Sequence, residues 1–229
     1  MNRVTGILGL AWFALFAAGT IVLQGEPPGF DQPIGEVREF FSQHGERYLV
    51  GDYLTGVAFV GLFLPFAAGL RAVLAAAGPQ DEILPRLAFT GAVLLVAVGG
   101  TSTAFLDVVA VSGGDPALDD STLRALVGAN GAAIALIGLP AALFSVAVAT
   151  AAWRTATLPR PLALAGWATG ALLAVGAAFP IQGGSDGLLF AVRFASFIAF
   201  ALFVLATSLS LLRAEASSPR TPHRGRAGR

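Results

Sequence analysis

The amino-acid sequence contains six apolar segments, each long enough to cross a lipid bilayer as a single helix. They are residues 4–23, 48–70, 87–111, 126–153, 162–180 and 188–212. The hydrocarbon core of a bilayer is about 30 Å thick, so a spanning helix needs roughly 20 mostly apolar residues. Because lipid offers no hydrogen-bond partners to the backbone, segments of this kind must form helices. The sequence therefore predicts an all-α, polytopic bundle of six transmembrane helices.

Composition agrees with this class. Only 12% of the residues are charged, whereas 55% are hydrophobic, and soluble domains carry about 25% charged residues. Little chain remains outside the apolar segments, so we expect one transmembrane domain over residues 1–213. Residues 214–229 are polar and lack hydrophobic periodicity, which predicts a disordered basic tail. Arginine without lysine, beside abundant alanine and glycine, is typical of high-GC genomes and favours an actinobacterial source.

The positively charged residues predict how the helices cross the membrane. All fourteen are arginines, and ten lie before the first segment, beside the second and fourth connections, or in the tail. The first, third and fifth connections are mainly acidic. Short cytoplasmic loops are enriched in arginine and lysine. We therefore expect a plasma-membrane protein with both termini in the cytoplasm.

A competing interpretation treats residues 1–23 as a cleaved signal peptide, which would leave five spans. The apolar region is long for a signal peptide, and its small residues, Ala17 to Thr20, lie inside the run instead of after it. We therefore keep six spans.

The first connection is the longest and has its own pattern. From Ile34 onward, apolar residues recur at helical spacing, at Val37, Phe40 and Phe41, with charged residues between them. This predicts a short amphipathic helix on the outer surface that leads into the second span.

The sequence predicts two helix kinks and one helix N-cap in the spans. Pro65 and Pro140 lie inside the second and fourth apolar segments, where a proline kinks a helix and neighbours must satisfy the carbonyl that it leaves unbonded. Asp120 or Ser121 is the expected N-cap of the fourth helix.

Most charged residues lie in the connections or the tail, but three lie inside apolar segments: Asp52, Asp107 and Arg193. At a rise of 1.5 Å per residue, each lies about 6–7 Å below the outer end of its helix. Asn130 lies at a similar or slightly shallower level on the fourth helix. Small and hydroxyl residues continue the same polar faces toward mid-membrane: Thr55, Gly56, Gly100, Thr103 and Ser196.

Placing an ionisable side chain inside a membrane costs free energy, so such side chains face the bundle interior and pair with one another or with backbone carbonyls. We expect Arg193 to lie between Asp52 and Asp107, with Asn130 completing the hydrogen bonds, because the guanidinium can serve two carboxylates. One interpretation is a static clasp that joins three helices. The other is an outward-facing pocket, in which Arg193 holds an anionic group or an aspartate carries a proton or admits a cation.

Several function classes lack their signatures. The chain has no cysteine and two histidines, so we expect no disulfide and no metal site. No phosphate-binding loop, dinucleotide fingerprint or nucleophile elbow occurs, so we expect no cofactor, and an enzyme is less favoured than a binding protein. The tail is too short to indicate nucleic-acid binding. The expected partner is the lipid bilayer, and the sequence leaves a homo-oligomer open.

Some short motifs are shared with a known group of proteins. These are Arg3-Val-Thr-Gly-Ile-Leu-Gly-Leu10, the helix Gly35-Glu-Val-Arg-Glu-Phe-Phe-Ser-Gln-His44, and Phe66-Ala-Ala-Gly-Leu-Arg71. With a Pro/Gly-rich outer loop, they resemble an uncharacterised family of actinobacterial six-helix, multi-pass membrane proteins. The resemblance implies the architecture and no catalytic residues.

The leading functional hypothesis is a membrane protein that binds a small ligand or lipid around Arg193, Asp52, Asp107 and Asn130. A proton- or ion-coupled transporter would need a polar path to the cytoplasm, and the inner half of the second span has no polar side chain. A small intramembrane enzyme would use Asp52 or Asp107 as general acid, beside an apolar pocket that opens laterally to lipid.

Overall fold

The computed structural model describes residues 2–25, 27–29, 31–78, 83–112, 118–182 and 187–216. Its elements are α1 (Asn2–Ala17), η1 (Ala18–Gln24), α2 (Ile34–Val57), η2 (Ala58–Phe63), α3 (Leu64–Ala77), α4 (Ile83–Val111), α5 (Asp120–Leu136), α6 (Gly138–Thr155), α7 (Arg160–Gly176), η3 (Phe179–Gln182) and α8 (Leu188–Ala216). No β-strand occurs within these ranges. The all-α prediction is confirmed.

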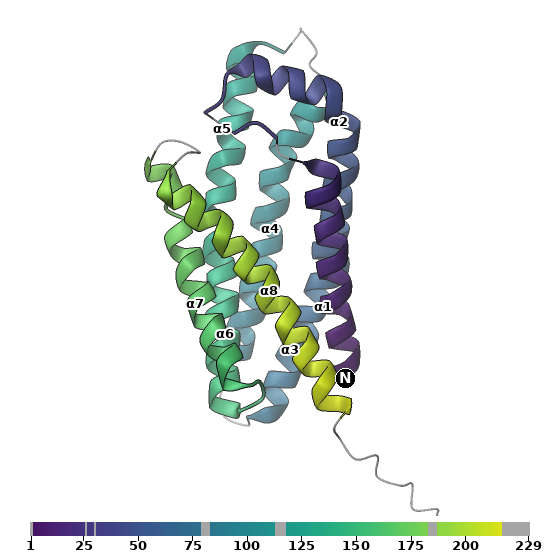
Figure 1. The fold of residues 1–229 in the computed structure, drawn as a ribbon, viewed down its shortest axis with the longest axis vertical. Helices are drawn as coiled ribbons and strands as arrows, with labels where there is room; N and C mark the ends of the chain where they lie inside the picture. Colours follow the sequence, from purple (N-terminus) through teal and green to yellow (C-terminus); the bar gives the residue numbers. More distant parts are fainter. Residues whose placement is uncertain are drawn as a thin grey trace, which may run out of the picture.

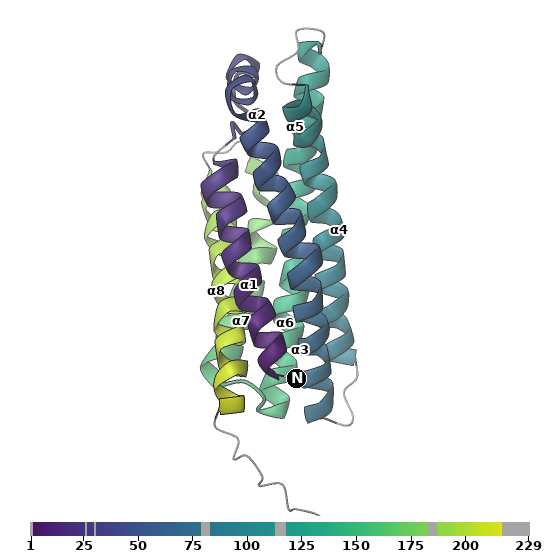
Figure 2. The same ribbon diagram turned by 90° about the vertical axis from the view of Figure 1, so that its right-hand side faces the viewer.

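The helices join into six stretches that are long and apolar enough to cross a membrane. They are Asn2–Gln24, Ile34–Ala77, Ile83–Val111, Asp120–Thr155, Arg160–Ile181 and Leu188–Ala214, and each contains one of the six predicted segments. The stretches pack into one elongated bundle, which α8 crosses at an angle (Figures 1 and 2). The N-terminus and the end of α8 share one end of the bundle, which we call the N-terminal end. The opposite end is the distal end.

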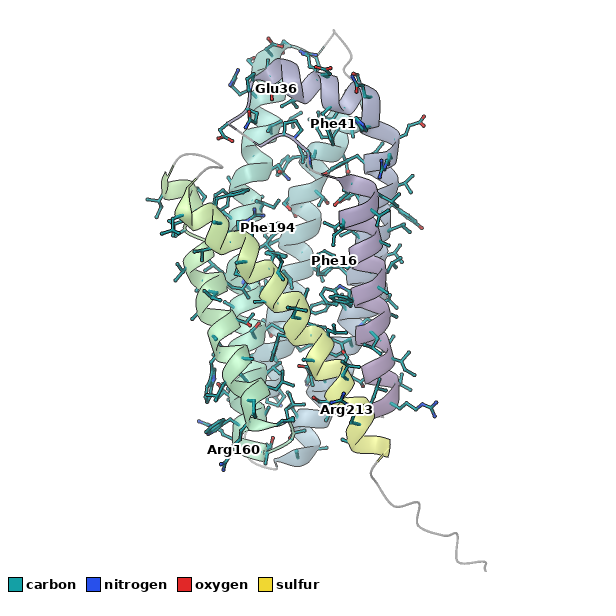
Figure 3. The ribbon with its side chains drawn as sticks, in the orientation of Figure 1. Phe16, Glu36, Phe41, Arg160, Phe194 and Arg213 are labelled. Carbon is teal, nitrogen blue, oxygen red and sulfur yellow. The ribbon has the colours of Figure 1, made fainter. Side chains whose placement is uncertain are left out.

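The first half of α2 forms the predicted amphipathic helix. It lies across the distal end before the helix turns to run along the bundle (Figure 1), and Figure 3 labels Glu36 and Phe41 on it. Val37 and Phe41 are buried in a small apolar core with Leu123 and Val127 of α5. The helical spacing of apolar residues thus seats this segment on the ends of its neighbours.

Both prolines coincide with irregular helix geometry. Before Pro65, residues Ala58–Phe63 adopt a π-helix. Before Pro140, α5 ends at Leu136 and α6 begins at Gly138. A proline ring lacks the N–H of a helical hydrogen bond and collides with the carbonyl four residues earlier, so the preceding turn widens or breaks. The predicted interruptions are confirmed in position.

The N-cap of α5 differs from the prediction by one residue. Asp119, not Asp120 or Ser121, caps the helix, because its carboxylate accepts hydrogen bonds from the backbone N–H groups of Ser121 at 2.9 Å and Thr122 at 3.0 Å. An N-cap side chain satisfies the N–H groups two and three residues ahead, which sets the start of the helix. Asp120 instead forms an ion pair with Arg38 of α2 at 2.8 Å.

A cluster of aromatic rings fills the middle of the bundle. Trp12, Phe63, Phe144 and Phe200 are at most 1% exposed and come from α1, η2, α6 and α8. The ring centroids of Trp12 and Phe63 lie 5.3 Å apart, and those of Phe144 and Phe200 lie 5.9 Å apart. These distances are typical of favourable aromatic pairs. We call these four residues the aromatic core.

Glycines let neighbouring backbones approach closely, as they do in many membrane bundles. A Cβ atom added at Gly91 of α4 would lie 2.7 Å from the backbone nitrogen of Phe144. One added at Gly138 would lie 2.7 Å from the carbonyl oxygen of Leu173 on α7. The α4–α6 and α6–α7 contacts therefore require glycine, which has no side chain, at positions 91 and 138.

Parts of the predicted connections and tail lie outside the described residues. They are Glu26, Asp81, Glu82, Asp115, Asp186 and residues 217–229. Residues 214–216, which the sequence assigned to the tail, form the last residues of α8.

Candidate functional site

A cavity of about 500 Å³ opens in the distal half of the bundle. Its walls come from α1 and η1, α2 and η2, α4, α5 and α8. Most of the lining is apolar, with Phe13, Phe16, Phe59, Leu95, Ile134 and Phe197 among its members. Ligand pockets in proteins measure about 300–1,000 Å³ and are mostly apolar with a few placed polar groups. The cavity has the size and lining of such a pocket.

The cavity is partly open, and several of its exposed lining residues lie on η1 and α8. Toward the distal end α8 diverges from α1, and α4 is visible between them (Figure 1). Lining residues on the two rims are largely exposed, with Ile21 of η1 at 73% and Phe194 of α8 at 61%. Figure 3 shows Phe194 and Phe16 on the two sides of this opening. In a membrane this opening would face lipid chains.

The aromatic core closes the cavity toward the N-terminal end. Phe16 and Phe59, both in the cavity wall, pack against Trp12 at ring-centroid distances of 5.3 and 5.6 Å. Phe197 packs in the same way on Phe200 at 6.5 Å. The cavity is therefore a pocket with an aromatic floor.

Three glycines leave space in the wall. A Cβ atom added at Gly56, Gly99 or Gly100 would meet no heavy atom within 4 Å, and all three residues line the cavity. Most packing glycines of this chain, such as Gly91, would instead bring the added atom within 3 Å of a neighbour. The missing side chains of Gly56, Gly99 and Gly100 thus enlarge the cavity and form no tight helix contact.

Asp52 brings a carboxylate to the cavity wall from α2. It accepts a hydrogen bond from Gln24 Nε2 at 2.8 Å, and its carboxylate faces Thr103 and Asp107 on α4. Because Gln24 ends η1, this bond ties the first span to the second. A hydroxyl contact between Thr20 and Thr55, 3.3 Å apart, adds to the same junction.

Arg193 faces the same cavity from α8. Its guanidinium carbon lies 5.0 Å from the ring centroid of Phe179 and 5.9 Å from that of Phe190, which are distances of cation–π contacts. Its Nε is buried without a hydrogen-bond partner among the described residues. Gly176 gives the backbone of Arg193 room, because an added Cβ would lie 2.7 Å from the Arg193 Cα.

The structure does not bring Arg193 between the two carboxylates. Asp52, Asp107 and Arg193 all belong to the described part of the chain, and no ion pair joins Arg193 to either aspartate. Asp107 lies beside Asp52, and its Oδ1 is buried without a hydrogen-bond partner among the described residues. The expected clasp geometry is therefore absent from this structure. Asp52 and Arg193 share a cavity, and Asp107 stands behind Asp52.

Asn130 also takes a different place from the one expected. Its Nδ2 donates to the carbonyl oxygen of Ser102 at 2.8 Å, which links α5 to α4. Ser102 lines the cavity, whereas Asn130 does not. Asn130 therefore supports the cavity wall through Ser102, and this hydrogen bond does not go to Asp52, Asp107 or Arg193.

Sequence reasoning found part of this wall and missed part. The faces that continue from Asp52 and Asp107 were expected to hold Thr55, Gly56, Gly100 and Thr103, and all four line the cavity. Gln24 was missed, although its position as a polar residue at the end of an apolar run is a usable signal. The aromatic floor was also missed, because phenylalanine in a span has no signature that separates packing from binding.

Comparisons with protein-family models, with curated proteins and with solved structures find no match to this chain. The site's chemistry must therefore be inferred from its own residues.

Proposed function

We propose that this protein is a multi-pass plasma-membrane protein that binds a lipid or lipid-like amphiphile in the distal cavity. The observation that carries the proposal is the cavity itself, about 500 Å³ of mostly apolar space that opens laterally. Asp52 and Arg193 border it, so a polar head group would find charged partners while an acyl chain contacts phenylalanine side chains. Exchange with the membrane would occur through the opening between α1 and α8.

In this proposal the distal end faces outward and both termini are cytoplasmic. The supporting observation is the distribution of arginine. The described arginines at the N-terminal end are Arg3, Arg71, Arg86, Arg154, Arg160 and Arg213, as expected for cytoplasmic loops. The cavity would then lie in the outer leaflet.

The aromatic floor argues against a transporter. A conducting path would have to pass Trp12, Phe63 and Phe200, which are at most 1% exposed. Water and ions do not cross a packed aromatic layer without a rearrangement that opens it. Binding at the outer side therefore fits the geometry better than passage through the bundle.

A second candidate is an intramembrane enzyme that uses Asp52 or Asp107 as general acid. Its supporting observation is the pair of facing carboxylates beside an apolar cavity, because two carboxylates this close repel unless a proton or cation lies between them. If this candidate is correct, lipid extract incubated with the protein changes in composition, and Asp107→Asn stops the change.

The binding proposal is tested by lipid that co-purifies with the full chain. The protein is extracted in an uncharged maltoside detergent, and bound lipid is measured by mass spectrometry. Gly99→Leu should fill the cavity and reduce bound lipid several-fold without loss of folding, because the new side chain enters open space.

Gly128→Leu is the matched control. Gly128 also has no heavy atom within 4 Å of an added Cβ, but it does not line the cavity. Equal lipid content in the wild type, Gly99→Leu and Gly128→Leu would contradict the proposal.

A further inference from the structure

Resting on the proposed function, we propose further that the cavity selects lipids whose head group carries both a phosphate and an ammonium group. The inference comes from the two kinds of charge on its wall. The cationic residue Arg193 lines the cavity from α8, and the anionic residue Asp52 lines it from α2. A zwitterionic head group is the ligand chemistry that satisfies both at once.

The phosphate would bind Arg193. Its guanidinium is held by Phe179 and Phe190, and these rings offer no hydrogen-bond acceptor. Its buried Nε has no partner among the described residues. Arginine binds phosphate through parallel hydrogen bonds in a planar fork. A phosphate oxygen would supply the acceptors that the surrounding rings lack.

The ammonium group would bind at Asp52. Its carboxylate accepts one hydrogen bond from Gln24 and faces Thr103 and Asp107. The Asp107 Oδ1 is buried without a hydrogen-bond partner among the described residues. Two carboxylates side by side attract a cation and repel an anion, so this part of the wall disfavours a purely anionic head group.

Internal pairing does not remove these charges. Opposite charges within a membrane protein usually pair with one another, yet Arg193 forms no ion pair with Asp52 or Asp107. Among the described residues, neither charge is therefore neutralised by an ion pair with the other.

The cavity's size fits part of such a lipid. About 500 Å³ accommodates a small head group and the upper part of one chain, and the remaining chain can leave through the opening beside Phe194. A phosphoethanolamine head group has the required charges and is small enough for this space.

The test measures retention of added lipids by the delipidated full chain in uncharged maltoside, using native mass spectrometry. The probes are dilauroyl phosphatidylethanolamine, dilauroyl phosphatidylglycerol, dilauroylglycerol and free phosphoethanolamine. We expect phosphatidylethanolamine to bind about tenfold more tightly than phosphatidylglycerol, since one charged hydrogen bond supplies that ratio. Free phosphoethanolamine should not compete at equal concentration.

Variants test whether Asp52 binds the ammonium group and Arg193 binds the phosphate. Asp52→Asn should abolish the preference for phosphatidylethanolamine, and Arg193→Gln should weaken both phospholipids. Glu36→Gln, which removes an exposed carboxylate that does not line the cavity, should change neither. Where Asp52→Asn does not fold, Asp107→Asn replaces it and should reduce the same preference.

The outcomes separate the two proposals. Equal or tighter binding of phosphatidylglycerol, equal binding of dilauroylglycerol, or equal competition by free phosphoethanolamine overturns the head-group inference but leaves binding in the cavity standing. Retention of no lipid at all, with no effect of Gly99→Leu, overturns the proposed function and the inference with it.

Discussion

Asp52 of α2 and Arg193 of α8 line one cavity without forming an ion pair with each other. Because they are not paired with each other, these charges inside apolar spans do not form a structural clasp between helices. A clasp would join them and neutralise their charge within the protein. Here each charge instead has its own support, Gln24 for Asp52 and two phenylalanine rings for Arg193. This arrangement leaves the cavity between them polar at its border and apolar elsewhere.

Arg193→Gln distinguishes the clasp from the cavity. Loss of the cation–π contacts with Phe179 and Phe190 should lower the free energy of unfolding by about 0.5–2 kcal/mol. Breaking a buried ion pair would cost about 3–5 kcal/mol. Unfolding in detergent by denaturant measures the difference. A loss in the larger range would indicate that Arg193 is an essential structural partner of a carboxylate.

Gly91→Ala should destabilise the bundle. The added Cβ would lie 2.7 Å from the backbone nitrogen of Phe144 and 2.9 Å from the carbonyl oxygen of Pro140. Overpacking of this kind costs about 1–3 kcal/mol, because neither backbone atom can move away easily. The measurement is the thermal midpoint in detergent. Gly128→Ala, with open space around the new atom, should leave the midpoint unchanged or raise it; equal losses in both variants would contradict the close α4–α6 contact.

Asp119 should make the start of α5 sensitive to acid. Hydrogen bonds from the Ser121 hydroxyl, and then from Thr122, hold the pKa of the Asp119 carboxyl well below its usual range. A lowered pKa in the folded state means that the cap stabilises the helix above the unfolded value of about 3.9 and is lost as pH falls below it. The protection of the first α5 amides against hydrogen exchange, measured relative to an unstructured chain at the same pH, should therefore fall below about pH 4. Asp119→Asn, which keeps an acceptor but cannot titrate, should remove this loss of protection, and its persistence would assign the effect to another group.

The proposed orientation can be measured with single cysteines, because the chain contains none. Ser42→Cys lies exposed on the first half of α2, and Ala214→Cys lies exposed at the end of α8. A membrane-impermeant maleimide added to intact cells should label Ser42→Cys, and should label Ala214→Cys only after the cells are broken. The reverse pattern would place the cavity in the cytoplasmic leaflet.

The sequence allowed the spans and their interruptions to be predicted because both depend on local chemistry. Apolar length determines a span, and Pro65 and Pro140 disturb the turn that precedes each of them. The fixed rise of a helix also allowed the depths of Asp52 and Arg193 to be estimated. It did not give their lateral distance, which depends on the angle at which α8 crosses the bundle and on how each helix is rotated about its own axis.

The N-cap of α5 shows a second limit. Asp119 and Asp120 are adjacent and chemically alike, so the pattern alone does not decide which one caps. In the structure, Arg38 of α2 pairs with Asp120, and Asp119 accepts the hydrogen bonds of the backbone; the sequence does not contain the position of Arg38. Likewise, the bond from Gln24 to Asp52 depends on how η1 ends beside α2.

A crystal structure of the full chain grown from a lipidic mesophase tests the central claim most directly. We expect elongated density in the cavity, with its chain between Phe16 and Phe194 and its polar end between Asp52 and Arg193. A cavity that holds only water, with Arg193 turned to bridge Asp52 and Asp107, would contradict the binding account and restore the clasp.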